Sequence, residues 1–185
     1  PNGEMFDYLN KELRGMKADI IDEHYYQRPE WFFANAKRYD NYPRNESKIF
    51  GGEYAAQSDR TVSIHNKNNW LTALSEAAFM TGLERNAGVV HMASYAPLFA
   101  HIDGWQWTPD LIWVDNLHSY GTTDYYVQKL FSTNRGSKVV PITMNNDVVA
   151  GQDSLYASAS IDAAANELII KIVNASGKEQ TNVLS

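Results

Sequence analysis

The stretch Lys48-Ile-Phe-Gly-Gly-Glu-Tyr-Ala-Ala56 organises the rest of the chain. It begins with β-prone residues, and Gly51 and Gly52 then allow another backbone or a ligand to approach closely. Glu53 follows where a strand would open into a loop. A glutamate at the mouth of a parallel-sheet strand is held rigidly and still reaches solvent and substrate. Glu53 is therefore a candidate functional carboxylate, although a surface glutamate after a glycine-rich turn is the simpler interpretation of this stretch alone.

Composition limits the class of protein. The chain has 185 residues, of which 44% are hydrophobic and 21% are charged, as in ordinary globular domains. The net charge of −6 and the lack of a basic run argue against nucleic acid as a partner. No apolar run approaches the ~20 residues of a membrane span, so we expect no membrane partner. Without cysteine there are no disulfides, thiolate–zinc sites or cysteine nucleophiles, and we expect no metal and no cofactor.

Helical and strand patterns alternate over residues 1–137. The predicted helices, which have apolar residues at helical spacing, cover residues 4–16, 29–40 and 70–86. The predicted strands cover residues 18–26, 48–56 and 88–95. This order predicts a parallel sheet with crossover helices on its face, and we expect the first helix to cover a core. Three parallel strands with bare edges make a poor independent domain, so residues 1–137 are predicted to be the C-terminal portion of a (β/α)8 barrel, which takes ~250 residues in full.

The pattern changes from Lys138 onward. Before Lys138, the third predicted strand is followed by a long aromatic loop over residues 96–109 and a predicted helix over residues 124–133. Strands are then predicted without intervening helices, over residues 139–143, 155–161 and 167–174. Successive strands separated by short turns predict an antiparallel module. We interpret residues 138–185 as the start of a β-sandwich domain.

The carboxyl ends of the three predicted strands are rich in hydrogen-bonding and aromatic side chains. They are residues 22–26, 53–54 and 91–95, the last followed by the aromatic loop. In (β/α)8 barrels these ends carry the chemistry, and aromatic rings suit stacking against sugar faces as well as apolar packing. A carbohydrate cleft is therefore predicted. Asp22, Glu23 and His24 are not expected to converge on a metal ion, because adjacent strand residues point to opposite faces.

Several blocks of the sequence closely resemble the α-L-arabinofuranosidases of glycoside hydrolase family 51. In order, they are Asp22-Glu-His-Tyr-Tyr26, Pro29-Glu-Trp-Phe32, Arg38-Tyr-Asp40, Phe50-Gly-Gly-Glu-Tyr-Ala55, Trp107-Thr-Pro-Asp-Leu-Ile112, Ser119-Tyr-Gly-Thr122 and Tyr126-Val-Gln-Lys-Leu-Phe131. The last three look like the final barrel loop and helix of that family. The resemblance covers about residues 19–140, and the strands beyond look like the start of the family's C-terminal β-sandwich.

The resemblance implies a retaining glycosidase that releases terminal α-L-arabinofuranosyl residues from arabinose-containing plant polysaccharides. By this resemblance, Glu53 matches the catalytic nucleophile of the family. His24 and Tyr26 match a segment that lines the family's subsite for the released sugar. Gln106, in the loop after the third strand, is a weaker candidate for contact with a sugar hydroxyl. The implied partner is an arabinose-containing oligo- or polysaccharide, the family allows a homo-oligomer, and a secreted or periplasmic location is favoured.

A retaining glycosidase also needs a second carboxyl group ~5–5.5 Å from the first, which acts as acid and then base. In the resembling family an Asn-Glu pair after an earlier barrel strand supplies it. The pair Asn45-Glu46 precedes a strand and the pair Asn166-Glu167 sits in a hairpin turn, so neither fits. We expect the acid/base residue upstream of Pro1, in the N-terminal remainder of the enzyme, and we expect these 185 residues alone to be inactive.

Two alternatives stay open. The chain could belong to another retaining barrel glycosidase, since a glutamate at a late strand end is shared across that broad clan. It could also be a non-catalytic carbohydrate-binding fragment that uses its aromatic side chains and β-rich part. The ordered strand-end motifs favour an enzyme, because a binding module has no need for them.

Overall fold

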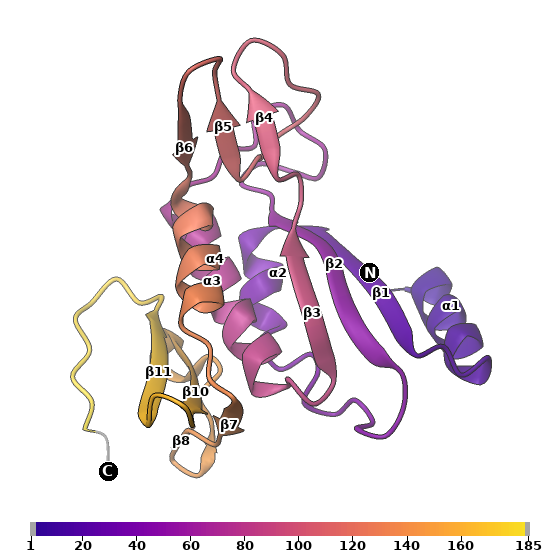
Figure 1. The fold of residues 1–185 in the computed structure, drawn as a ribbon, viewed down its shortest axis with the longest axis vertical. Coiled ribbons are helices and arrows are strands. Elements are labelled where there is room, and N and C mark those ends of the chain that lie inside the picture. The colour runs from indigo at the N-terminus through magenta and orange to yellow at the C-terminus, as the bar shows by residue number, and fades with distance from the viewer. Residues whose placement is uncertain (1–2, 184–185) are drawn as a thin grey trace.

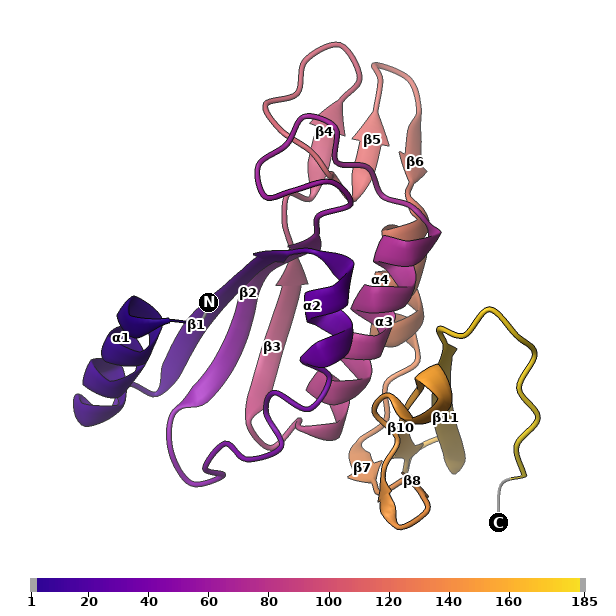
Figure 2. The ribbon, with the colours of Figure 1, turned by 180° about the vertical axis from the view of Figure 1, so that it is seen from behind.

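Three parallel strands form the sheet that carries Glu53. In the computed structural model, which describes residues 3–183, the strands are β1 (Ile20–Gln27), β2 (Lys48–Ala56) and β3 (Val90–Tyr95), paired in chain order. Helices α2 (Pro29–Ala34) and α3 (Trp70–Arg85) connect them and lie on one face of the sheet (Figures 1 and 2). The predicted parallel sheet with crossover helices is confirmed.

An aromatic core fills the space between the sheet and these helices. Phe79 of α3 lies at its centre, with ring centroids 5.6 Å from Tyr25, 5.4 Å from Phe32 and 6.1 Å from Tyr54. All three are edge-on contacts, the arrangement that aromatic pairs favour. Much of the aromatic excess in the sequence therefore serves packing behind the sheet.

Two predicted helices differ from the structure. The helix expected over residues 29–40 ends at Ala34, and the chain continues through successive turns that still bury Ala36 and Tyr39. The first helix forms as α1 (Glu4–Gly15), but the prediction that it covers a core is wrong for this chain. It lies beyond the β1 edge of the sheet (Figure 1), and Met5 of its apolar face is 69% exposed.

A second small sheet stands beyond the carboxyl ends of the first. It consists of β4 (Phe99–His101), β5 (Ile112–Val114) and β6 (Ser119–Gly121), and α4 (Thr123–Thr133) then packs beside α3 (Figure 1). The helix matches the prediction for residues 124–133. The sheet as a whole was not predicted, because strands of three residues are too short to show an alternating pattern.

The C-terminal strands form an antiparallel sheet in the order β11-β10-β7, as the sequence predicts. Its members are β7 (Lys138–Val140), β10 (Leu155–Asp162) and β11 (Glu167–Asn174). Between β7 and β10 lie the short hairpin strands β8 (Thr143–Met144) and β9 (Asp147–Val148) and the 3-10 turn η1 (Gln152–Ser154). Tyr156 and Val173 of the sheet pack against Ala77 and Ala78 of α3. Helix α3 is therefore buried between two sheets.

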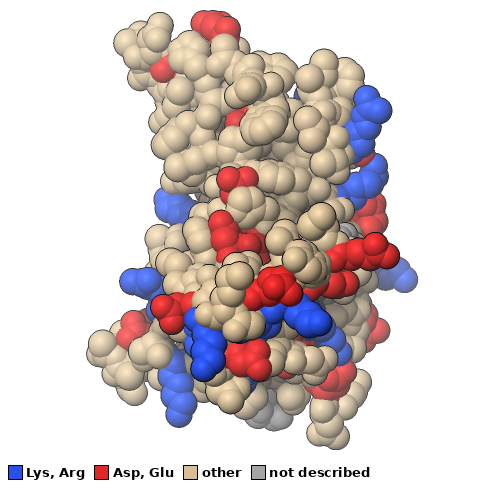
Figure 3. All heavy atoms as spheres, turned by 90° about the vertical axis from the view of Figure 1, so that its right-hand side faces the viewer, with Lys and Arg blue, Asp and Glu red and all other residues tan. Residues whose placement is uncertain are grey.

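Figure 3 views the side of the molecule that carries α1 and the β1 edge. Charged side chains of both signs are interspersed over the lower part of this face, and the end formed by the β4–β6 loops carries few. Within residues 3–183, no helix combines the length and the apolar character needed to cross a bilayer.

Gly82 of α3 lies against the turns that follow α2, and a Cβ at this position would overlap the carbonyl oxygen of Ala36. We expect Gly82→Ala to lower the free energy of unfolding by about 1–3 kcal/mol, because backbone on both sides of the contact would have to shift. Gly15→Ala at the end of α1 is the matched control, since a Cβ there meets nothing within 4 Å. Chemical denaturation measures both variants, and equal effects would contradict the close helix contact.

Candidate active site

A bulge in β2 sets the direction of the Glu53 side chain. Ile49 and Gly51 face the buried side of the sheet, so regular alternation would place Glu53 there as well. Instead, β2 has two residues, Gly51 and Gly52, between Phe50 and Glu53, opposite the single residue Glu23 between Asp22 and His24 of β1. The extra residue moves Glu53 to the uncovered face and leaves Tyr54 in the core. Bulges commonly re-aim a side chain in this way beside active sites.

Gly52 makes room for the neighbouring carboxylate at this bulge. A Cβ on Gly52 would overlap the carboxylate of Asp22, and the Gly52 N–H donates to Asp22 Oδ1 at 3.1 Å. The sequence predicts a close approach to Gly51 and Gly52 by a backbone or a ligand, and in the structure the side chain of Asp22 from β1 approaches Gly52. Asp22 Oδ2 lies 2.9 Å from His24 Nε2, so the same carboxylate also orients the imidazole.

Glu53, His24 and Tyr26 come together at the carboxyl ends of β1 and β2. The Tyr26 hydroxyl donates to Glu53 Oε2 at 2.6 Å, and His24 Nδ1 lies 3.5 Å from the same oxygen. The Glu53 side chain is 44% exposed. Burial, followed by the hydrogen bond to Glu53, raises the pKa of Tyr26, which keeps its phenol protonated as a donor at neutral pH.

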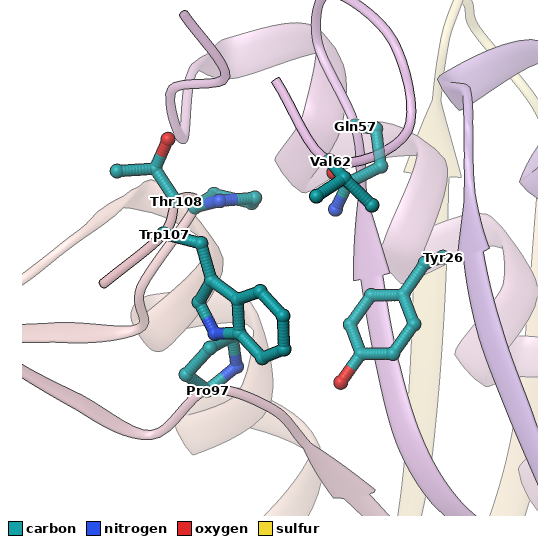
Figure 4. Close-up of a pocket in the computed structure, with 7 residues that line it drawn as sticks. Tyr26, Gln57, Val62, Pro97, Trp107 and Thr108 are labelled. Carbon is teal, nitrogen blue, oxygen red and sulfur yellow. The ribbon is translucent and has the colours of Figure 1, made fainter. Parts of the chain in front are cut away.

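A pocket of about 90 Å³ adjoins this cluster (Figure 4). Its lining comes from three segments far apart in the chain: Tyr26, Gln57, Val62, Pro97, Trp107, Thr108 and Pro109. The Trp107 indole lies across the pocket from the Tyr26 ring (Figure 4). Gln57 is held in place on both ends, because its amide donates to the Ala55 carbonyl and accepts from Asn66. The pocket thus has an aromatic wall on each side.

Gln106 lies elsewhere in the same loop. It is exposed, and its neighbour Trp107 lines the pocket in its place. A contact between Gln106 and a sugar stays a prediction. Val62 and Pro97 carried no signal in the sequence, since the folding of two separate loops brings them to the pocket.

The opposite face of β1 carries a buried carboxylate with a structural environment. Glu23 accepts hydrogen bonds from the hydroxyls of Tyr25, Tyr39 and Tyr42, and Arg38 lies 3.6 Å away. Burial and then the Glu23 charge raise the pKa of Tyr42 to about 12, so this phenol also stays a donor. Glu23 therefore points away from Asp22 and His24, as strand alternation predicts. Within residues 3–183, no three His, Asp or Glu side chains are arranged to hold a metal ion.

Asp110 follows the pocket-lining Pro109 and is buried, with one carboxylate oxygen lacking a hydrogen-bond partner in the described part of the chain. Burial raises the pKa of Asp110 to about 6. The folded protein therefore binds this proton more tightly than the unfolded chain does, and the resulting stabilisation is lost as the pH rises through about 6.

We expect Asp110→Asn to remove the loss of stability that occurs as the pH rises through about 6, because asparagine has no proton to release there. The free energy of unfolding of the variant, relative to the parent protein, should rise by roughly 1–3 kcal/mol between about pH 4 and about pH 7. Denaturation curves at several pH values measure this difference. A difference that stays constant across the range would contradict the titration of Asp110.

Comparison with known proteins places this geometry in a family. The family model described as the alpha-L-arabinofuranosidase C-terminal domain matches residues 52–184. The chain is 51% identical over 139 residues to an extracellular exo-alpha-L-arabinofuranosidase of Streptomyces chartreusis, covering 75% of this chain and 16% of that protein. It is 36% identical over 169 residues to alpha-L-arabinofuranosidase 2 of Arabidopsis thaliana, covering 90% of this chain and 24% of that one.

Solved structures agree. The arabinose-bound α-L-arabinofuranosidase MgGH51 superposes with a TM-score of 0.77 at 37% identity, covering 88% of this chain and 26% of that chain. The arabinose complex of the Thermotoga maritima α-L-arabinofuranosidase, at 16% identity and a TM-score of 0.55, shares the fold, with 88% of this chain and 39% of that chain covered. The chain thus spans about a sixth to a quarter of the length of the curated relatives above. It belongs to the glycoside hydrolase family 51 α-L-arabinofuranosidases and corresponds to a C-terminal portion of them.

Proposed function

We propose that this chain supplies the nucleophile and part of the sugar pocket of a retaining α-L-arabinofuranosidase. One observation carries the proposal: the bulge in β2 turns Glu53 to the uncovered face, where Tyr26 hydrogen-bonds it beside an aromatic pocket. The named relatives are arabinofuranosidases, which supports an arabinose-containing oligo- or polysaccharide as the substrate.

In this proposal Glu53 attacks the anomeric carbon of a terminal arabinofuranosyl group. The bond from that carbon to the leaving oxygen breaks, a glycosyl ester forms on Glu53, and water then hydrolyses the ester with net retention of configuration. Both contacts found at the Glu53 carboxylate, from Tyr26 and His24, are to Oε2. Within the described residues this leaves Oε1 as the oxygen that attacks, while Tyr26 orients the carboxylate.

The pocket beside Glu53 suits one side of a sugar ring. Trp107 and Tyr26 are aromatic rings on opposite sides of the pocket, and the amide of Gln57, which also lines it, is fixed by its own hydrogen bonds. Aromatic faces pack against the C–H face of a sugar and leave its hydroxyls to polar groups. Gln106, directly before Trp107 in the same loop, remains a proposed contact with a sugar hydroxyl.

The acid/base carboxyl group is proposed to come from outside these 185 residues. Asp22 is the carboxylate tied to Glu53 through His24, but Gly52 and His24 already hold its two oxygens. It therefore serves to position its neighbours. The chain spans 16% and 24% of two relatives, which leaves room in their remaining length for the second carboxyl group. These residues alone are accordingly proposed to be inactive.

We also propose the domain organisation that this role requires. Residues 1–137 would form the C-terminal portion of a (β/α)8 barrel, and residues 138–185 the start of a β-sandwich. Support comes from three parallel strands in chain order with helices on one face, and from the uncovered opposite face that carries Glu53. In a closed barrel that opposite face would be the interior.

Replacing the nucleophile tests the proposal in the full-length enzyme. We expect Glu53→Gln to lower kcat for an aryl α-L-arabinofuranoside at least about a thousandfold, because the amide cannot form the glycosyl ester. Glu46→Gln is the matched control, since Glu46 is exposed and ion-paired with Arg14 before the start of β2.

The control should keep the parent rate, and proton NMR of the first sugar released by the parent enzyme should show a retained anomeric configuration. Substantial arabinose release by Glu53→Gln, or an inverted first product, would contradict the assignment.

A further inference from the structure

Two fully buried carboxyl groups lie behind the nucleophile strand. Glu76 of α3 and Asp124 of α4 have no exposed surface, and neither faces the pocket beside Glu53. Glu76 Oε1 accepts the backbone N–H of Ala56 at 2.8 Å. Ala56 is the last residue of β2, three positions after Glu53, so Glu76 ties the end of that strand to α3.

Asp124 lies where the N-termini of two helices meet. It belongs to the first turn of α4, and its Oδ2 accepts from the hydroxyls of Thr123 at 2.9 Å and Thr72 at 3.2 Å. Thr72 itself forms the capping box of α3 with Asn69. The N-terminal ends of helices favour negative charge, and hydrogen-bond donors stabilise a carboxylate. Burial raises the pKa of Asp124 above its usual range, while these hydrogen-bond donors lower it, so Asp124 is the better stabilised of the two as an anion.

Glu76 and Asp124 are neighbours: Thr72, which donates to Asp124 Oδ2, lies one helical turn before Glu76 in α3, and each carboxyl group shifts the pKa of the other. Among the described residues, Glu76 Oε2 and Asp124 Oδ1 are buried and have no hydrogen-bond partner. Two ionised carboxylates buried in contact would repel each other and forfeit their hydration. A single proton between these two oxygens removes the repulsion and completes the hydrogen bonding of both. Burial, and then the Asp124 charge, raise the pKa of Glu76 well above its usual range, which agrees with this placement.

Among residues 3–183, no positively charged side chain contributes to the pKa of either carboxyl group, so none replaces such a proton. Tyr54 of β2 donates to Gln128, and Asn68 donates to the hydroxyl of Tyr95 of β3. Asp110 adds a further carboxyl group on the side of Tyr95. Ionisation of Glu76 would therefore place a second negative charge beside Asp124, and relief would require α3 and α4 to separate.

We propose that Glu76 is a positioning residue for Glu53, holding the end of β2 through a carboxyl group that stays protonated by sharing one proton with Asp124. The inference rests on the proposed role of Glu53 for its effect on activity, but the shared proton does not depend on that role. Neutral Glu76 accepts from Ala56 with one oxygen and donates to Asp124 with the other. The strand beyond the bulge is thereby fixed to two helices at once.

Three variants of the full-length enzyme test this proposal. Glu76→Gln presents the same pattern of one acceptor and one donor, so it should keep kcat for an aryl α-L-arabinofuranoside within about threefold of the parent value. Glu76→Ala leaves the Ala56 N–H without its acceptor and removes the group that shares a proton with Asp124, so it should lower kcat at least about tenfold with a smaller change in KM. Thr81→Ala is the control, because it removes another buried hydroxyl of α3 that bonds only within its helix.

A second measurement reads the proton directly and does not need activity. A raised carboxyl pKa stabilises the fold below its unfolded value, and this stabilisation is lost as the pH rises through the folded pKa. Between about pH 5 and about pH 9, the Tm of the parent enzyme should therefore fall more steeply than that of Glu76→Gln, whose amide has no such proton to lose. Thr81→Ala should parallel the parent.

Parallel Tm profiles for the parent and Glu76→Gln would overturn the shared proton, even if Glu76→Ala fails to fold. A loss of kcat in Glu76→Gln as large as in Glu76→Ala would overturn the positioning role. Failure of the proposed nucleophile is a separate result, since it would appear as retained activity in Glu53→Gln while the Tm profiles still diverge.

Discussion

Without the bulge at Gly51 and Gly52, the two-residue period of β2 would turn Glu53 toward the helices, on the same side as Ile49. A carboxylate placed in that aromatic core would have to be neutralised or paired, at a cost of several kcal/mol. The extra residue reverses the facing of the strand at the position where its chemistry begins. It also brings the Gly52 N–H to Asp22, which in turn orients His24. The candidate site therefore depends on two residues that have no side chains.

Three glutamates near the same sheet show how environment separates chemical roles. Glu53 is half exposed and keeps one oxygen held by a phenol, which suits a nucleophile. Glu23 is buried among three phenols with Arg38 nearby, which suits a structural role. Glu76 is buried against another carboxyl group and is best explained as a neutral acid. Identical side chains thus differ in function because burial and hydrogen-bond donors differ around them.

Much of the fold could be predicted from the sequence, and the misses have physical causes. The strand over residues 48–56 and the pairing of His24 and Tyr26 with Glu53 follow from periodicity and family resemblance. The bulge could not be predicted, because glycine gives no signal of which face it occupies. Trp107 instead of Gln106 lines the pocket through the path of a loop between three-residue strands. Glu76 carries no signal in the sequence, because only tertiary packing buries it.

Covalent labelling tests the role of Glu53 most directly. The full-length enzyme would be incubated with an arabinofuranoside that is fluorinated beside the anomeric carbon and carries a good leaving group, which slows breakdown of the glycosyl-enzyme. Peptide mass spectrometry then locates the sugar. We predict one arabinofuranosyl adduct, on the peptide that contains Glu53, and its loss in Glu53→Gln. An adduct on another carboxylate, or turnover without any covalent adduct under conditions that trap the intermediate, would contradict this role.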